Sequence, residues 1–394
     1  MCVASDSHSN HYGGIGCLGS PLVRTDAASI WATSRTWWQI PPVARVNFVG
    51  TLPPGVTAED IAVALNIFFK SDVPNHAVEF TGSEETMASL PVDSRLTIAN
   101  MTTEMTALRF VSFSLSGLFP VDKTLERWLR NKATEATILD DRTTRLRITH
   151  EKIDELFANP LTADRDAVYA KQLYLNLDTL APYVSGPDSV KVGTPLHELA
   201  PQHIKINRVQ LYIAAASAPE QEAAEAVGDW QTLLDAGAQA LPAGCGPCIG
   251  LVQACWLEQG RVGHRDAQTY LASPQVVAAS ALKGVISGPD TYEVPTNWSG
   301  VEYGYGTSAE PTTETKLSNF VQQMESLIEQ VESIETPRSE VDILPGFPEK
   351  ISGEIIFCDA DNLNTDGIYP GKCTYQDNFS KEDMARVCME NYDP

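Results

Sequence analysis

The sequence predicts an α/β protein built in layers around parallel sheets. Two observations carry this prediction. Strand-like and helix-like segments alternate from Val46 to Leu282, and Leu173 to Leu177 alternates apolar and polar residues as a half-buried strand does. The composition agrees: 43% of the residues are hydrophobic and 20% are charged, the balance of a globular chain that buries a core.

The first part of the chain begins with a strand-like start that runs into a polar motif. A strand is expected at Val46–Val49, after the break made by Pro41-Pro42. Thr57 is expected to cap the next helix, because its side chain can accept a hydrogen bond from the first helical turn. An apolar stripe through Ile61 and Phe68 supports that helix. The other expected elements are a glycine-dense loop at Tyr12–Gly19, a small-residue helix at Asp26–Ser34, an αβ pattern leading to Leu96–Glu104 and a charged, helix-like stretch at Glu126–Arg147.

The second part continues the alternation and then changes character. Further elements are expected as a strand at Val209–Ala216, helices at Pro219–Ala226 and Trp230–Ala238, and a buried helix at Val276–Leu282. Lys316–Glu335 carries apolar residues at helical spacing with acids between them, which predicts an amphipathic helix. Polar linkers flank it, and a new small domain is expected from Ile355 onward.

These segments predict five regions. Residues 1–45 form the end of a first α/β sub-domain, residues 46–165 a second and residues 166–303 a third. Residues 304–349 form a linker with the amphipathic helix, and residues 350–394 the start of a further domain.

Net charge and composition exclude several classes of function. The formal charge of -23, with no Lys/Arg-rich block, argues against binding of nucleic acid, because phosphates would be repelled. No apolar run reaches the roughly 18 residues of a membrane span, and the first residues resemble no signal or transit peptide. The eight cysteines do not suggest a disulfide framework. Five are expected to be buried, inert thiols: Cys17, Cys255, Cys358, Cys373 and Cys388.

Cys245-Gly246-Pro247-Cys248 is the sharpest local motif. Two thiols at this spacing can share a metal or cluster, or cycle as a redox disulfide. The aromatic residue usual before the redox motif is absent, and no second thiol or imidazole pair lies at zinc-site spacing. The residues alone leave these readings open.

Two polar groups could handle protons. Asp6, Ser7 and His8 place a carboxylate, a hydroxyl and an imidazole in sequence, although a capping Asp and a surface His are the ordinary alternative. Asn100 and Glu104 share one face of a helix if that segment is helical, although both could simply face solvent.

Together these motifs resemble the aconitase family, and within it the homoaconitase branch. The family's order of motifs is kept: Asp6–Asn10, the Gly13–Gly19 loop, Asn100-Met101 with Glu104, and Gly244–Gly250. The branch is indicated by Arg24–Thr33, Thr36–Pro42, Glu79–Glu85 and Thr365–Lys372. The resemblance covers nearly the whole chain. It implies three-layer α/β sub-domains with parallel sheets and, from residue 350, the start of a swivelling domain.

The resemblance also implies a hydro-lyase with a [4Fe–4S] cluster. Its reaction would be the reversible hydration of cis-homoaconitate, a small tricarboxylic acid, to homoisocitrate in lysine biosynthesis. Cys245 and Cys248 would be cluster ligands. Asp6 would orient a histidine, Ser7 and His8 would line the pocket, Asn100 would position the substrate or its water, and Glu104 would exchange protons with that water. A mitochondrial, monomeric protein without membrane or nucleic-acid partners is expected.

The chain departs from the family's pattern inside its length. Arg109–Leu115 is an apolar insert. The family's Ser-Cys-Thr-Asn segment, with the third cluster thiolate, is absent between Arg208 and Val209, and an arginine-bearing loop is absent between Gly263 and His264. The upstream histidines and a later serine loop also fall outside the sequence.

These departures predict a labile cluster and no turnover for the chain as written. The alternatives are a non-catalytic remnant or faulty gene model of such an enzyme, and a thiol–disulfide oxidoreductase that uses Cys245 and Cys248. Six predicted site residues are expected to line one cleft between sub-domains: Asp6, His8, Asn100, Glu104, Cys245 and Cys248. Cys245 should lie within about 20 Å of His8, since a cluster-bound substrate must touch both sides of the pocket.

Overall fold

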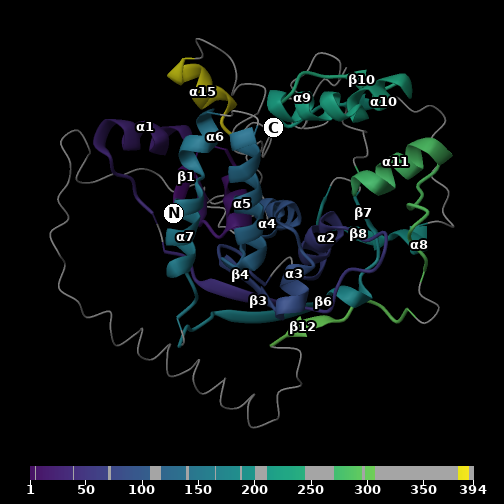
Figure 1. Cartoon of the computed structure of the whole chain (residues 1–394), viewed down its shortest axis with the longest axis horizontal. Helices are drawn as coiled ribbons and strands as arrows, with labels where there is room; N and C mark the ends of the chain where they lie inside the picture. The colour runs from purple at the N-terminus through teal and green to yellow at the C-terminus, as the bar shows by residue number, and fades with distance from the viewer. Residues whose placement is uncertain are drawn as a thin grey trace, which may run out of the picture.

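A computed structural model describes most of the first 306 residues and a short helix near the end of the sequence. The described ranges are 1–4, 6–38, 40–69, 72–106, 117–138, 142–164, 166–186, 189–199, 211–244, 270–294, 298–306 and 380–389. The arrangement of their helices and strands is that of an α/β protein (Figure 1).

A five-stranded sheet forms the centre of the described structure. Its order is β12 (Tyr303–Tyr305), β6 (Lys171–Asn176), β3 (Val43–Val49), β4 (Ala77–Gly82) and β5 (Gly117–Leu118). All neighbours are parallel except the edge pair β12–β6. The strands predicted at Val46–Val49 and Leu173–Leu177 are therefore confirmed in type. The sheet takes strands from both sides of the expected boundary at residue 165.

Burial alternates along β3 because successive side chains of a strand point to opposite faces. Ala44, Val46 and Phe48 face the core and are at most 1% exposed. Arg45 and Asn47 point the other way and are only half-buried. The core face is covered by α2 (Ala58–Phe68), α3 (Glu84–Ala88) and α4 (Val92–Thr106) (Figure 1).

The helix predicted after Thr57 is confirmed as α2, with a capping box between Thr57 and Asp60. The Asp60 carboxylate accepts hydrogen bonds from Thr57 N at 2.7 Å and Thr57 Oγ1 at 2.9 Å. Its other oxygen accepts from the backbone N–H of Tyr183 at 2.9 Å. Burial outweighs these bonds and raises the pKa of Asp60 to about 6. Asp60 thus joins α2 to the start of β7 (Tyr183–Ser185).

A buried ion pair fixes the beginning of α4. Arg95 is fully buried, and its Nη1 and Nη2 bind the two carboxylate oxygens of Asp122 at 2.9 and 2.7 Å. The same guanidinium donates to the carbonyls of Met87 and Leu90 at 2.8 and 3.0 Å. Asp122 also accepts hydrogen bonds from the backbone N–H groups of Thr124 and Leu125 in the first turn of α5 (Lys123–Ile138), so one carboxylate holds two helices together.

The glycine-dense segment expected to be a loop is a short 3-10 helix, η1 (Ser9–Ile15), that ends at Gly16 with φ of 71°. It packs directly on α4: a Cβ on Gly14 would lie 2.6 Å from the backbone nitrogen of Leu96. Glycine therefore serves close approach of two backbones here. On either side, β1 (Cys2–Ala4) and β2 (Gly19–Pro21) pair in parallel, and the predicted strand-like start is confirmed.

The helix predicted at Asp26–Ser34 is confirmed as α1 (Arg24–Thr33), although none of its residues is buried. The charged stretch predicted at Glu126–Arg147 forms two helices, α5 (Lys123–Ile138) and α6 (Arg142–Arg147). A further helix, α7 (His150–Ala158), packs beside α5 through Arg130, which binds both Glu126 and Asp154.

The rest of the described chain forms smaller units. An antiparallel sheet has the order β11 (Leu271–Ala272), β7, β8 (Gly193–Pro195), and β9 (Tyr212–Ile213) pairs in parallel with β10 (Gln239–Ala240). The short elements η2 (Leu177–Thr179) and α8 (Leu196–Leu199) follow β6 and β8. The predicted helices at Pro219–Ala226 and Trp230–Ala238 are confirmed as α9 (Ala218–Val227) and α10 (Asp229–Asp235).

Two expectations about burial are wrong. The helix at Val276–Leu282 exists as α11 (Pro274–Lys283), but only Val276 and Ser280 are buried, and Leu282 is 89% exposed. Its small residues allow surface packing as readily as burial. Cys388, expected to be buried, is exposed just after α15 (Lys381–Val387), and Cys17 is only half-buried.

Several expectations lie outside the described residues: the amphipathic helix at Lys316–Glu335, the insert at Arg109–Leu115, and Cys255, Cys358 and Cys373. The division into five regions stays a prediction. Across the ranges that the structure describes, no helix is both long and apolar enough to span a bilayer.

Candidate active site

The Asp6-Ser7-His8 motif forms a compact turn that leads into η1. The Asp6 carboxylate accepts a hydrogen bond from the backbone N–H of His8 at 2.8 Å, and the Asp6 carbonyl accepts from Ser9 Oγ, also at 2.8 Å. Ser7 Oγ lies 2.9 Å from Nδ1 of His8, so its hydroxyl can hold that side of the imidazole. These contacts leave Nε2 of His8 pointing outward from the motif.

Asn100 and Glu104 lie one turn apart on α4, so the predicted helical spacing is confirmed. Nε2 of His8 lies 4.0 Å from Oε1 of Glu104. The two side chains are 31% and 34% exposed, so solvent or a small molecule can reach them. A separation of 4.0 Å is too long for a direct hydrogen bond, yet a water placed at about 2.8 Å from each atom could bond to both.

The structure thus brings Asp6, Ser7, His8, Asn100 and Glu104 to one place, although the two segments are far apart in sequence. An imidazole and a carboxylate that can share one water form a pair able to move a proton to or from a reacting group. This chemistry is compatible with hydration or dehydration, and by itself it does not name a substrate.

Three buried polar residues that sequence reasoning missed join the two segments. Asn10 Nδ2 donates to the carbonyl of Asn100 at 3.2 Å and to Oγ1 of Thr102 at 2.8 Å. Thr103 Oγ1 donates to the carbonyl of Ser7 at 3.2 Å. The sequence offered one indication of these residues, because they lie within or beside the two polar motifs. No local pattern in the sequence shows that they bond to one another.

The two predicted cluster ligands, Cys245 and Cys248, lie outside the described residues, so their expected approach to His8 stays a prediction. Within the described part of the chain, no group of three or more His, Cys, Asp or Glu side chains is arranged to hold a metal ion.

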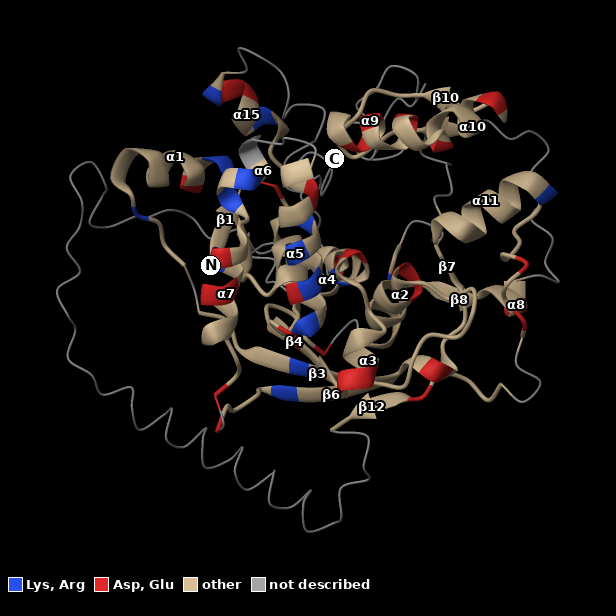
Figure 2. Ribbon diagram, in the orientation of Figure 1, with Lys and Arg blue, Asp and Glu red and all other residues tan. Residues whose placement is uncertain are grey.

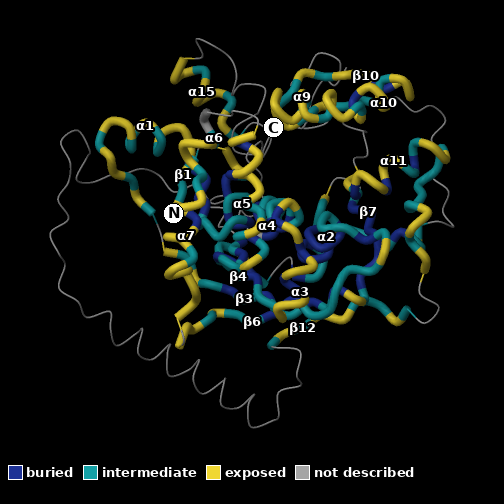
Figure 3. The backbone as a smooth tube through the Cα atoms, in the orientation of Figure 1, coloured by how far each residue is buried: buried dark blue, intermediate teal, exposed yellow. Residues whose placement is uncertain are grey.

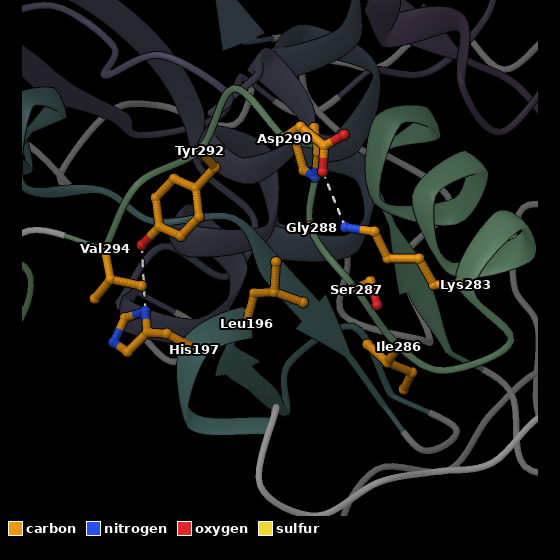
Figure 4. A pocket seen from close by; sticks show the side chains of 10 residues that line it. Leu196, His197, Lys283, Ile286, Ser287, Gly288, Asp290, Tyr292 and Val294 are labelled. Carbon is orange, nitrogen blue, oxygen red and sulfur yellow. Dashed lines mark hydrogen bonds and ion pairs between the residues drawn. The ribbon is translucent and has the colours of Figure 1, made fainter.

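A separate surface pocket of about 490 Å³ lies between α8, the end of α11 and the loop that follows it (Figure 4). Tyr292 points across it, with its hydroxyl 3.2 Å from Nδ1 of His197. Burial raises the pKa of the Tyr292 hydroxyl. Lys283 pairs with Asp290 at 3.0 Å on the opposite side. None of the predicted site residues lines this pocket.

Comparison with known proteins identifies relatives for the whole chain. It is 53% identical to a mitochondrial homoaconitase of Aspergillus fumigatus over 456 aligned residues, which cover all of this chain and 57% of the relative. It is 52% identical to a mitochondrial homoaconitase of Emericella nidulans, of which 59% is covered, and 48% identical to one of Candida albicans, of which 60% is covered. The chain therefore spans less than two thirds of these relatives.

These alignments are longer than the 394 residues of the chain, so the relatives contain residues that this chain lacks within the aligned region. A family described as "Aconitase family (aconitate hydratase)" matches residues 1–210 and 202–284. The two matched pieces overlap at residues 202–210, a range that includes Arg208 and Val209, between which the sequence predicts a missing segment. The matched residues include the His8 motif and the Glu104 helix, and on this evidence the chain belongs to the aconitase family.

Proposed function

We propose that this chain carries part of the active site of a homoaconitate hydratase, which adds water reversibly to cis-homoaconitate to give homoisocitrate in lysine biosynthesis. That part is the substrate-facing group of Asp6, Ser7, His8, Asn100 and Glu104. The carrying observation is the pairing of His8 with Glu104 at 4.0 Å in a chain that is 53% identical over its whole length to a protein named homoaconitase. Enzymes of this family act on small tricarboxylic acids, and they are hydro-lyases. The relatives are named as mitochondrial proteins, and this chain shares that location.

In the proposed mechanism, each described residue has a distinct task. Glu104 takes a proton from the attacking water, or returns it in the reverse direction, and His8 binds the same water or the substrate hydroxyl from the other side. Ser7 holds Nδ1 of His8 and leaves Nε2 directed at Glu104. The Asp6 carboxylate fixes the backbone of His8, and Asn100 borders the same space one turn away on α4.

Aconitase-family enzymes generally use a [4Fe–4S] cluster. In this chain Cys245 and Cys248 would hold the cluster, which when bound supplies a Lewis-acidic iron for the substrate hydroxyl and carboxylate. A cluster with one open iron needs a third thiolate, and the segment that carries it in the family is absent. Among the described cysteines, Cys2, Cys17 and Cys388 are free thiols. We propose a monomer whose cluster is labile.

A chimera tests the roles of His8 and Glu104 separately from the question of whether this chain holds a cluster. Residues 1–106 of this chain replace the matching residues of the Aspergillus fumigatus relative, and the chimera is expected to hydrate cis-homoaconitate. Glu104→Gln should lower kcat about 10²–10³-fold, the usual cost of removing a preorganised charged partner. Glu85→Gln, an exposed carboxylate on α3, is the matched control and should leave kcat unchanged. An unaltered rate in the Glu104→Gln chimera would refute the assignment.

The unmodified chain tests the expected loss of the cluster. After anaerobic treatment with iron and sulfide, it should show no stable cluster absorption and no hydration of cis-homoaconitate, because two thiolates anchor the cluster incompletely. Insertion of Ser-Cys-Thr-Asn between Arg208 and Val209 should restore the absorption. Hydration by the unmodified chain would show that the ligands have been misassigned.

A further inference from the structure

Asn10 links the two halves of the His8–Glu104 pair from inside the protein. It belongs to η1 and is fully buried. Its side-chain nitrogen reaches α4 and donates to the Asn100 carbonyl at 3.2 Å and to Thr102 Oγ1 at 2.8 Å. His8 precedes Asn10 by two residues, and Glu104 follows Thr102 by two, so the link joins the two segments within two residues of each member of the pair.

The hydrogen-bond partners of Asn10 define which side chain can stand there. The Thr102 hydroxyl donates its proton to the Ala99 carbonyl at 2.7 Å, so its oxygen is left to accept. The Asn100 carbonyl can only accept. Both partners therefore require a donor, and an amide NH₂ supplies two from one nitrogen. A carboxylate of the same shape would meet two oxygens and repel them.

Two other contacts show that the spacing between η1 and α4 is set closely. Thr103 Oγ1 donates to the Ser7 carbonyl at 3.2 Å, next to His8 itself. Gly14 lies so near α4 that a single added methyl group would meet the Leu96 backbone. Between these two contacts, Asn10 is the residue that ties η1 to the turn of α4 that carries Glu104.

We propose that Asn10 is a positioning residue for the hydration reaction, and this proposal rests on the proposed function. Asn10 touches neither substrate nor reacting atoms. It holds the backbone of η1 against α4 so that Nε2 of His8 and Oε1 of Glu104 stay close enough to share one water. Loss of its two donors lets the pair separate without removing either catalytic group.

Nuclear magnetic resonance of the full chain tests the geometry without any need for turnover. With ¹⁵N-labelled histidine, Glu104→Gln should shift the ring resonances of His8, because the two side chains are neighbours. In an Asn10→Asp background the same Glu104→Gln change should leave those resonances in place. Thr97→Ala is the matched control: Thr97 is also on α4, but its hydroxyl bonds only within the helix, to the Asp93 carbonyl at 3.1 Å.

A milder pair of variants keeps the test open if Asn10→Asp does not fold. Thr102→Ala removes one acceptor and should reduce the Glu104-dependent shift of His8, whereas Thr102→Ser keeps the hydroxyl and should preserve it. A shift of undiminished size in either Asn10→Asp or Thr102→Ala overturns the proposal. So does the absence of any shift in the otherwise unmodified chain.

The chimera supplies the kinetic readout. There Asn10→Asp should lower kcat about tenfold or more, in line with the cost of small misplacement at an active site, and leave KM within about twofold, since uniform binding is untouched. A chimera that never hydrates cis-homoaconitate would refute the proposed function and leave the resonance result to decide the geometry. A rise in KM of about tenfold or more with kcat unchanged would assign Asn10 to substrate binding and overturn the positioning role.

Discussion

The region around η1, α4 and the central sheet differs sharply from the region built by α9, α10 and the β9–β10 pair. In the first, α2 buries every residue from Asp60 to Asn66, and β3 and α4 each bury the side chains that face the core (Figure 3). In the second, α9 buries no residue, α10 buries only Trp230, and both residues of β10 are exposed. Acidic side chains also line α9 and α10 (Figure 2).

The comparison shows which of the predicted site residues are held in place by packing within the described structure. His8 directly precedes η1 and Glu104 lies on α4, and these two helices pack against each other, so the geometry of the pair follows from that packing. The chain that leads to Cys245 leaves a two-residue strand, and its last described backbone bond runs from Gly244 N to the Ala215 carbonyl at 2.9 Å. Substitutions in the first region should therefore cost much more stability than those in the second.

The largest expected effect comes from Arg95→Met. It leaves the Asp122 carboxylate and the Met87 and Leu90 carbonyls without their shared donor, and breaking a buried ion pair in this way costs about 3–5 kcal/mol of unfolding free energy. Urea unfolding followed by circular dichroism measures the loss.

Arg130→Met is the control for that measurement. Arg130 also binds two carboxylates, but its side chain is 35% exposed, so the expected loss is below about 1 kcal/mol. Equal losses in the two variants would remove the distinction between core and surface ion pairs in this chain.

Asp60 should make the core region sensitive to pH. Its pKa is raised from 3.8 to about 6 in the folded protein, so the folded state holds this proton more tightly than the unfolded state. The stabilisation is complete below about pH 4 and is lost as the pH rises through about 6. The unfolding free energy of the wild type, relative to Asp60→Asn at each pH, should fall by up to about 3 kcal/mol between about pH 4 and pH 7. A difference that does not change with pH would contradict the raised pKa.

Gly14→Ala should have an intermediate effect of about 1–3 kcal/mol, because the new methyl group forces two backbones apart. Gly228→Ala, between α9 and α10, meets no atom within 4 Å and pays only for its φ of 87°, about 1 kcal/mol. Melting temperatures of the two variants compare close approach with backbone strain. A larger loss for Gly228→Ala would reverse the expected ranking of the two regions.

The smallest effect is expected on α9. Val227 is 72% exposed, and Val227→Ala should change the unfolding free energy by less than about 0.5 kcal/mol. Truncation of a buried aliphatic side chain to Ala costs about 2 kcal/mol or more. A loss of that size for Val227→Ala would mean that α9 packs against more than its described neighbours.

The sequence predicted what depends on local pattern. Thr57 capped its helix because the capping bond spans only one turn, and Asn100 and Glu104 shared a face because helical periodicity is local. The expected loop at Tyr12–Gly19 became η1 because tertiary contact with α4 decided its conformation. Asn10 and Thr102 could not be paired in advance, since their bond joins segments 92 residues apart. The exposure of Leu282 was missed because a small, apolar helix fits a surface as well as a core.

The order of strands in the central sheet has a consequence for how this protein folds. β3 lies in the middle and pairs with β4 and with β6, with Val46 beside Leu173. Every parallel pairing therefore closes a long loop, and such topologies have high contact order and fold slowly. The helix η1, which directly follows His8, forms the hydrogen bond from Phe119 N to the Gly13 carbonyl only when a segment more than 100 residues further along the sequence is in place. During refolding, protection of the η1 amides from hydrogen exchange should appear together with that of β3 and β4, and not before it.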